Sequence, residues 1–243
     1  MRSALTAVAA LALLGAAANA AEAPRPLRVL VFDVTYSARS TRAVKTSGMA
    51  PNAHGIGTHN LSGSGNAVRE MDGIDHGKLE VDVVAATAEG ALVVDAAFAG
   101  TNSQPPVRVV VFSDGRLSWN PVQPLGPAAL RVLPLLARGL MTDKDVSPGS
   151  SWSVAAAPPQ KGALTYSVRH VEGDRATIEI EGTRGVSGSD EYEHASTLYA
   201  VDLLAPISLA FDARIHRQIG VDDSLTTEAH LTAMLVSDTF AKK

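Results

Sequence analysis

Histidine is the residue type in this chain best suited to bind a metal, because the sequence has seven histidines and no cysteine. Imidazole and carboxylate groups together can bind zinc. If the last hairpin turns near residue 222, His216 lies opposite residue 229 or 230 and shares a face with His230, with Glu228 close by. No third ligand has a defined spacing, so we favour two solvated histidines and predict neither a metal nor a cofactor.

Acidic residues gather in the segment DEYEH at 190–194. On a strand, successive side chains point to opposite faces, which places Glu191 and Glu193 on one face and Tyr192 and His194 on the other. Charged residues in such an alternation usually face water. We therefore expect a solvated strand face here and assign no acid or base role to the two glutamates.

Known catalytic motifs are missing from the sequence. The segment GSGNAV at 63–68 lacks the third glycine of a dinucleotide-binding loop, and neither G-x-S-x-G nor H-E-x-x-H occurs. The chain has 21 basic and 25 acidic residues and no basic block, which disfavours a nucleic-acid partner. We predict no catalytic residue, although a hydrolase site assembled from distant residues stays open as an alternative.

Residues 1–20 predict a secretory signal peptide. Arg2 supplies the positive start, residues 4–18 are apolar, and Ala18-Asn19-Ala20 is a small-x-small cleavage site. The apolar stretch is shorter than the about 20 residues of a spanning helix. We therefore expect cleavage after Ala20, a periplasmic or secreted protein, and one domain over residues 21–243 without a transmembrane segment.

Alternation of apolar and polar residues dominates the remaining chain and recurs with turn residues every 8 to 14 positions. Leu79 and Val81, for example, alternate with Glu80 and Asp82. This pattern is typical of antiparallel sandwiches and barrels. Hairpins are predicted over residues 79–99, 107–119, 164–180 and 207–235.

Two segments depart from the alternation. Residues 126–140 have leucines at helical spacing after Pro127, and Pro134 is expected to kink this helix or split it into two short pieces. Residues 38–77 are rich in glycine and polar residues, and they include the group MDGIDHG at 71–77, which matches no known ligand spacing. We predict a mobile loop over 38–77, with one weak strand near 57–70.

The predicted fold is mainly β: a curved antiparallel sheet or incomplete β-barrel with one short helical plug.

Asp33, Thr35 and Ser37 follow one apolar run, and Asp114 follows another. These residues resemble the metal-dependent adhesion site of a von Willebrand factor A domain, where oxygen ligands bind a hard cation. Asp33 together with Asp222 and Asp223 similarly resembles the acids of a haloacid dehalogenase. Both folds need parallel strands joined by helices, which the sequence does not predict. We therefore favour a polar strand end and an Asp-Gly turn.

Two further phrases, VSPGSSWSV at 146–154 and GDRATIEIEG at 173–182, are similar to phrases in exported domains. With the predicted curved sheet and helical plug, the chain resembles the bacterial lipoprotein-localisation factor superfamily. The resemblance implies a half-barrel whose inner face binds acyl chains.

The sequence thus predicts an exported, non-enzymatic binding protein that holds a lipid or other apolar molecule in the concave face of the sheet. The alternatives are a structural or interaction domain with a partner protein in the cell envelope, and less favoured, a hydrolase or adhesion domain. The same apolar rows could also close on one another as an ordinary core. The predicted ligand-binding residues are Leu133, Leu136, Leu164, Tyr166, Val168, Leu209, Phe211 and Leu231.

Overall fold

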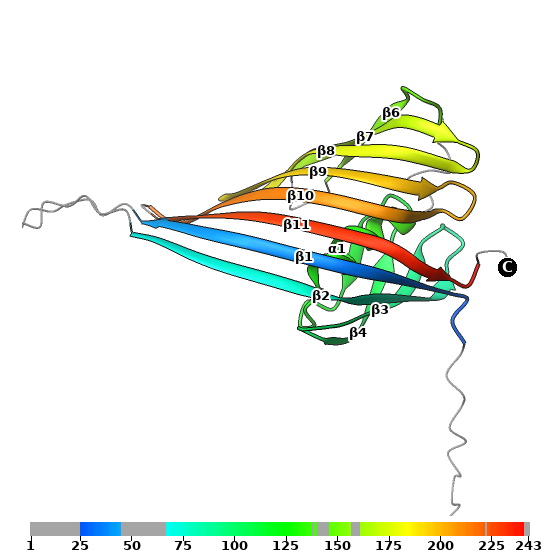
Figure 1. The fold of residues 1–243 in the computed structure, drawn as a ribbon, viewed down its shortest axis with the longest axis horizontal. Coiled ribbons are helices and arrows are strands. Elements are labelled where there is room, and N and C mark those ends of the chain that lie inside the picture. The colour runs from blue at the N-terminus through cyan, green and yellow to red at the C-terminus, as the bar shows by residue number, and fades with distance from the viewer. Residues whose placement is uncertain are drawn as a thin grey trace, which may run out of the picture.

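The computed structural model describes residues 25–44, 67–137, 139, 146–156, 161–221 and 223–240. These residues form strands in two series, with two short helices between them (Figure 1). The first series is β1 (Arg28–Val44), β2 (Ala67–Ala86), β3 (Leu92–Gly100), β4 (Gln104–Val111) and β5 (Leu117–Trp119). The helices are α1 (Pro127–Val132) and the 3₁₀ helix η1 (Leu133–Leu136). The second series is β6 (Ser151–Ala155), β7 (Lys161–Glu172), β8 (Arg175–Val186), β9 (Ser189–Ala200), β10 (Ala205–Gly220) and β11 (Asp223–Asp238).

All these strands belong to one antiparallel sheet in the order β5-β4-β3-β2-β1-β11-β10-β9-β8-β7-β6. Each series is a simple meander, and the two meet where β1 pairs with β11, near the two ends of the chain. Within the described residues, β5 and β6 are the edge strands and do not pair with each other, so the sheet is open. The predicted fold class, a mainly β open antiparallel sheet with a short helix, is confirmed.

The helical segment connects one edge of the sheet to the other. Pro134 lies in the first turn of η1, where its missing N–H costs no hydrogen bond. The α-helix therefore gives way to a 3₁₀ turn that ends at Ala137, whose backbone is extended (φ −68°, ψ 122°). The expected split at Pro134 is confirmed, whereas Arg138 and Leu140, in the predicted helix, lie outside the described residues.

The core forms where the helices cover one face of the sheet. On β1, Leu30, Phe32 and Val34 are buried while Asp33 and Thr35 are exposed, as the period-two pattern requires. The helices contribute buried side chains to the same cluster: Ala128, Ala129, Val132, Leu133, Leu135 and Leu136. The face covered by the helices is called the inner face below, and the opposite face the outer face.

The predicted loop over residues 38–77 is wrong at both of its ends. Residues 38–44 continue β1 and residues 67–77 belong to β2, in a register that runs from Arg28 opposite Val83 to Val44 opposite Ala67. The backbone ladder, together with the pairing of β1 to β11, extends the strands through a segment with little apolar periodicity, because strand formation depends on its neighbours more than on intrinsic propensity. Residues 45–66, with most of the weak strand predicted at 57–70, lie outside the described residues.

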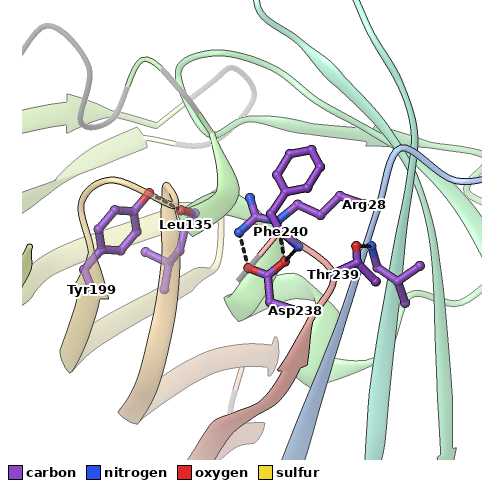
Figure 2. Close-up of polar contacts among 7 residues, drawn as sticks. Arg28, Leu135, Tyr199, Asp238, Thr239 and Phe240 are labelled. Carbon is purple, nitrogen blue, oxygen red and sulfur yellow. Dashed lines mark hydrogen bonds and ion pairs between the residues drawn. The ribbon is translucent and has the colours of Figure 1, made fainter. Parts of the chain in front are cut away.

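Two polar contacts hold the chain ends and the helix to the sheet (Figure 2). Arg28 at the start of β1 donates two hydrogen bonds to Asp238 at the end of β11, at 3.0 and 2.5 Å, and its guanidinium lies 5.3 Å from the ring centre of Phe240. The Tyr199 hydroxyl donates to the carbonyl oxygen of Leu135 at 3.1 Å. Burial raises the pKa of Tyr199, so this phenol stays protonated and remains a donor.

Candidate functional site

A cavity of about 500 Å³ lies on the inner face, between the helices and the second series of strands. Its walls come from α1 and η1, from β5 and the turn before it, and from β6 to β10. Both edge strands of the sheet, β5 and β6, border this cavity. The larger apolar side chains of the lining are Leu117, Trp119, Leu130, Leu135, Val154, Leu164, Tyr166, Ile180, Val186, Leu209 and Phe211.

The eight predicted ligand-binding residues divide into two groups. Four line the cavity: Leu164, Tyr166, Leu209 and Phe211. The other four are buried in the core and are not part of the cavity lining: Leu133, Leu136, Val168 and Leu231. The sequence left open whether the inner rows form a ligand-binding cavity or an ordinary core. In the structure, one part of these rows closes as a packed core and another part borders a cavity.

Two arginines and two glutamates form an ion-pair cluster in the cavity wall. Arg131 of α1 lies 3.4 Å from Glu193 and also pairs with Glu191, both on β9. Arg184 on the neighbouring strand β8 donates through Nε to Glu193 at 2.5 Å. The Glu193 side chain is only 4% exposed. We call these four residues the charged quartet.

The expectation of a solvated face at residues 190–194 is therefore wrong for Glu193. Glu191 and Glu193 continue the inner row of β9 that contains Ala195, Thr197 and Tyr199. The sequence shows this row by its alternation, but it does not show that a guanidinium 62 residues away neutralises the carboxylate. Sequence reasoning also missed Arg131, Arg184 and Trp119 as lining residues. The continuous period-two row from Tyr199 back to Glu191 is the signal that could have placed the glutamates on the inner face.

Three aromatic side chains interact with members of the quartet. The Arg131 guanidinium lies over the Phe211 ring, 4.5 Å from its centre, which is a favourable cation–π geometry. Burial raises the pKa of Tyr166 to about 12, with a smaller opposing effect from Arg184. Burial also raises the pKa of Tyr36. The charge of Arg131 lowers this pKa and the charge of Glu191 raises it, both by less than burial does. Both phenols are therefore neutral hydrogen-bonding groups at ordinary pH.

The exposed ion pair Asp114–Arg116 lies at the border of the cavity, with 2.6 Å between Oδ2 and Nε. Asp114 also accepts from the backbone N–H of Arg116, and Gly115 has a φ of +85°. This is the Asp-Gly turn that we favoured over an adhesion site. Asp33 is exposed on β1, paired in register with Lys78 and Met234. The antiparallel sheet excludes the two folds that the acids resembled.

The proposed neighbourhood of His216 and His230 is wrong. His216 lies opposite Thr226 and accepts or donates a hydrogen bond there at 3.3 Å, whereas His230 lies opposite Asp212 and pairs with it. The hairpin turns where expected, with Gly220 opposite Asp223, but the register differs from the expected one and includes a shift between Gln218 and Gly220, so the two histidines lie four positions apart along the ladder.

The other acids considered at the sequence level have partners of their own. Asp75 accepts from the backbone N–H of Thr101 at 3.0 Å, and Asp223 pairs with Arg42. Asp222 lies outside the described residues. In the part of the chain that the structure describes, no group of three or more histidine, aspartate or glutamate side chains is arranged to hold a metal ion.

A second, much smaller cavity of about 40 Å³ lies on the other side of α1. Tyr36, Leu79, Phe98 and the helix residues Ala128 and Ala129 line it. It has room for about one water molecule by volume. We therefore treat the larger cavity as the candidate site.

Comparison with known proteins adds no family. No protein-family model matches the chain, and no curated protein sequence is significantly similar to it. Among solved structures, one described as lipid-protein interactions in lipovitellin is similar with a TM-score of 0.43 and 11% identity, over 90% of this chain and 26% of that chain. The chain thus spans about a quarter of the lipovitellin chain. The resemblance to the lipoprotein-localisation factor superfamily stays a prediction.

None of the helices in the described part of the chain has the length and hydrophobicity needed to cross a membrane.

Proposed function

We propose that this chain is a binding protein that holds a lipid or another largely apolar small molecule in the inner-face cavity. The observation that carries the proposal is the cavity itself. Its volume of about 500 Å³ lies in the range of about 300–1,000 Å³ that is typical of small-molecule sites. Leucines and aromatic rings make up most of its large side chains, as in such sites, and the charged side chains of the lining form two ion-paired groups.

The state of the carboxylates supports binding over catalysis. Glu191 and Glu193 accept hydrogen bonds from guanidinium groups, which hold them as ion-paired carboxylates. The arginine side chains occupy carboxylate oxygens that a general acid or base would turn toward a substrate. We therefore assign the quartet to ligand positioning.

The site of action is part of the same proposal. Residues 1–20 lie outside the described residues, and their sequence supports export to the periplasm or beyond. An exported carrier meets lipids and other apolar molecules of the cell envelope.

The first experiment is native mass spectrometry of the protein purified from a periplasmic extract without detergent, followed by organic extraction of the complex. We expect a bound lipid or other apolar molecule in stoichiometric amount. A mass equal to that of the chain alone, unchanged after lipid addition, contradicts the proposal and favours an interaction domain of the envelope.

A pair of tryptophan substitutions tests whether the cavity is the place of binding. Leu164 lines the cavity, so Leu164→Trp fills part of it, whereas the adjacent Thr165 is exposed. We expect L164W to lower the amount of bound molecule at least tenfold and T165W to leave it unchanged. Equal loss in both variants contradicts the assignment to this cavity.

A further inference from the structure

We propose that the cavity selects an uncharged amphiphile, with one apolar chain and a hydroxyl or ester headgroup, over the same chain with a charged end. The inference rests on the proposed function and names its ligand class. It follows from the charged side chains that line the cavity, because each of them pairs with a side chain of opposite charge.

Six charged side chains line the cavity, and each has a partner of opposite sign in the lining. They are Asp114, Arg116, Arg131, Arg184, Glu191 and Glu193. Arg116 pairs with Asp114, and the charged quartet forms the other group. Among the residues that the structure describes, the lining therefore carries three positive and three negative charges, and their sum is zero.

A charged headgroup finds no unpaired partner among the described lining residues. The Glu193 carboxylate is 4% exposed and pairs with both Arg131 and Arg184, so a ligand anion must compete with a buried carboxylate for the same guanidinium groups. A ligand cation meets the matching difficulty, because the carboxylates already have arginine partners. Placing a charge in the apolar part of the cavity without a partner costs more than leaving it in water.

An uncharged oxygen fits the quartet without breaking an ion pair. A guanidinium has five N–H donors, and Arg131 gives one nitrogen to each glutamate. The remaining N–H groups of the arginines can donate to a hydroxyl or ester oxygen. The apolar chain then lies against the walls that contain Leu164, Leu209 and Trp119.

The chain carries its own fluorescent reporter for the test. It has two tryptophans, of which Trp119 lines the cavity while Trp152 is stacked on Tyr166 and lies outside the lining. Binding is measured at pH 8 by the change in Trp119 emission with three probes below their micellar concentrations: monoolein, oleate and oleylamine. The Trp119→Phe variant is the control that identifies the reporting residue.

We expect monoolein to bind at least tenfold more tightly than oleate or oleylamine. Equal or tighter binding of either charged probe overturns the inference while it supports the proposed function. If none of the probes binds, and the purified protein carries no apolar molecule, the proposed function itself fails and the inference fails with it.

Charge variants of the quartet provide the second test. Glu193→Gln leaves one positive charge in excess and should improve oleate relative to monoolein about tenfold, whereas Arg184→Gln leaves one negative charge and should favour oleylamine. The double variant is neutral again and should restore the preference for monoolein. If E193Q does not fold, Glu191→Gln makes the same charge change at a residue that is less buried. An unchanged order of the three probes in folded single variants overturns the inference.

Discussion

The inner face of this sheet has two halves that differ in how closely their side chains pack against the helices. In the packed half, β1 to β4 present large aliphatic and aromatic side chains to the helices, and Leu30, Phe32, Leu79, Val81 and Val109 are no more than 1% exposed. In the open half, β6 to β10 border the cavity of about 500 Å³ with part of their inner rows, although Val168, Ile178 and Tyr199 on these strands are also no more than 1% exposed. One continuous sheet therefore supplies both a core and a cavity.

The difference comes from side-chain size and charge in corresponding inner rows. On β8 and β9, the inner rows pass from apolar residues to Gly182, Arg184, Glu193 and Glu191, which cannot fill the space under the helix as leucines do. An added Cβ at Gly182 would lie 2.1 Å from the carbonyl oxygen of Ala163, so a close approach of the backbones also requires glycine there. Close packing is the rule for interiors, and the rows depart from it where ion pairs replace hydrophobic contacts.

The largest expected difference between the halves concerns their ion pairs. Arg28 and Asp238, at the end of the packed half, are 11% and 1% exposed. Arg28→Met removes the guanidinium that pairs with the buried Asp238 carboxylate. We expect a loss of about 3–5 kcal/mol in the free energy of unfolding. Arg184→Met should cost less, because Arg131 still pairs with Glu193. Urea unfolding of both variants measures the two losses.

Equal losses in the two arginine variants would show that the open half is as rigidly packed as the other. A control at Arg108, exposed and paired with Asp95, should show a much smaller loss than either variant when it is replaced by methionine, because water screens an exposed ion pair.

The next effect compares two leucines. Leu133 is fully buried in the packed half, and Leu133→Ala should lower the free energy of unfolding by about 2–5 kcal/mol, since it removes core contacts and leaves a void. Leu164 is half-buried at the cavity, where its side chain already borders open space. Leu164→Ala should therefore cost about 1 kcal/mol. Urea unfolding checks both values, and a cost at Leu164 equal to that at Leu133 contradicts the division into halves.

The smallest effect lies on the outer face behind the packed half. Burial raises the pKa of Asp82, with further contributions from Glu80 and Asp95, and its buried Oδ1 has no hydrogen-bond partner among the described residues. Because the folded state favours the protonated acid, this contribution to stability is present at low pH and is lost as the pH rises through the raised pKa. At pH 7 the carboxylate is a cost. Asp82→Asn should stabilise the protein by about 1 kcal/mol, which raises the Tm by about 2–4 °C.

The gain from Asp82→Asn should shrink below about pH 4, where the acid is protonated in the folded and unfolded states. Its neighbour Asp95 is the matched control. A hydrogen bond from Arg108 lowers the pKa of Asp95, so Asp95→Asn should destabilise at pH 7 where Asp82→Asn stabilises. Thermal unfolding at both pH values tests the sign, and a loss of stability in D82N at pH 7 contradicts the argument.

The sequence by itself determined most of the strands and which of their residues share a face. Alternation is a local property of the chain, since every second side chain points the same way, and it predicted the hairpins of β2 with β3, β7 with β8 and β10 with β11. Pro134 likewise acts on its own turn of the backbone, so the split of the helix could be predicted. Hence the fold class was available from the sequence.

Only the tertiary structure decided which inner rows close and which stay open. The pairing of β1 with β11 joins residues about 200 positions apart, and it turns the predicted loop ends at 38–44 into strand. The register of β10 with β11 separates His216 from His230, because a shift of a few residues in one turn moves every partner. Glu193 pairs with Arg131 only because the helix lies against the sheet next to β9. Such contacts depend on distance in space, which spacing along the chain does not specify.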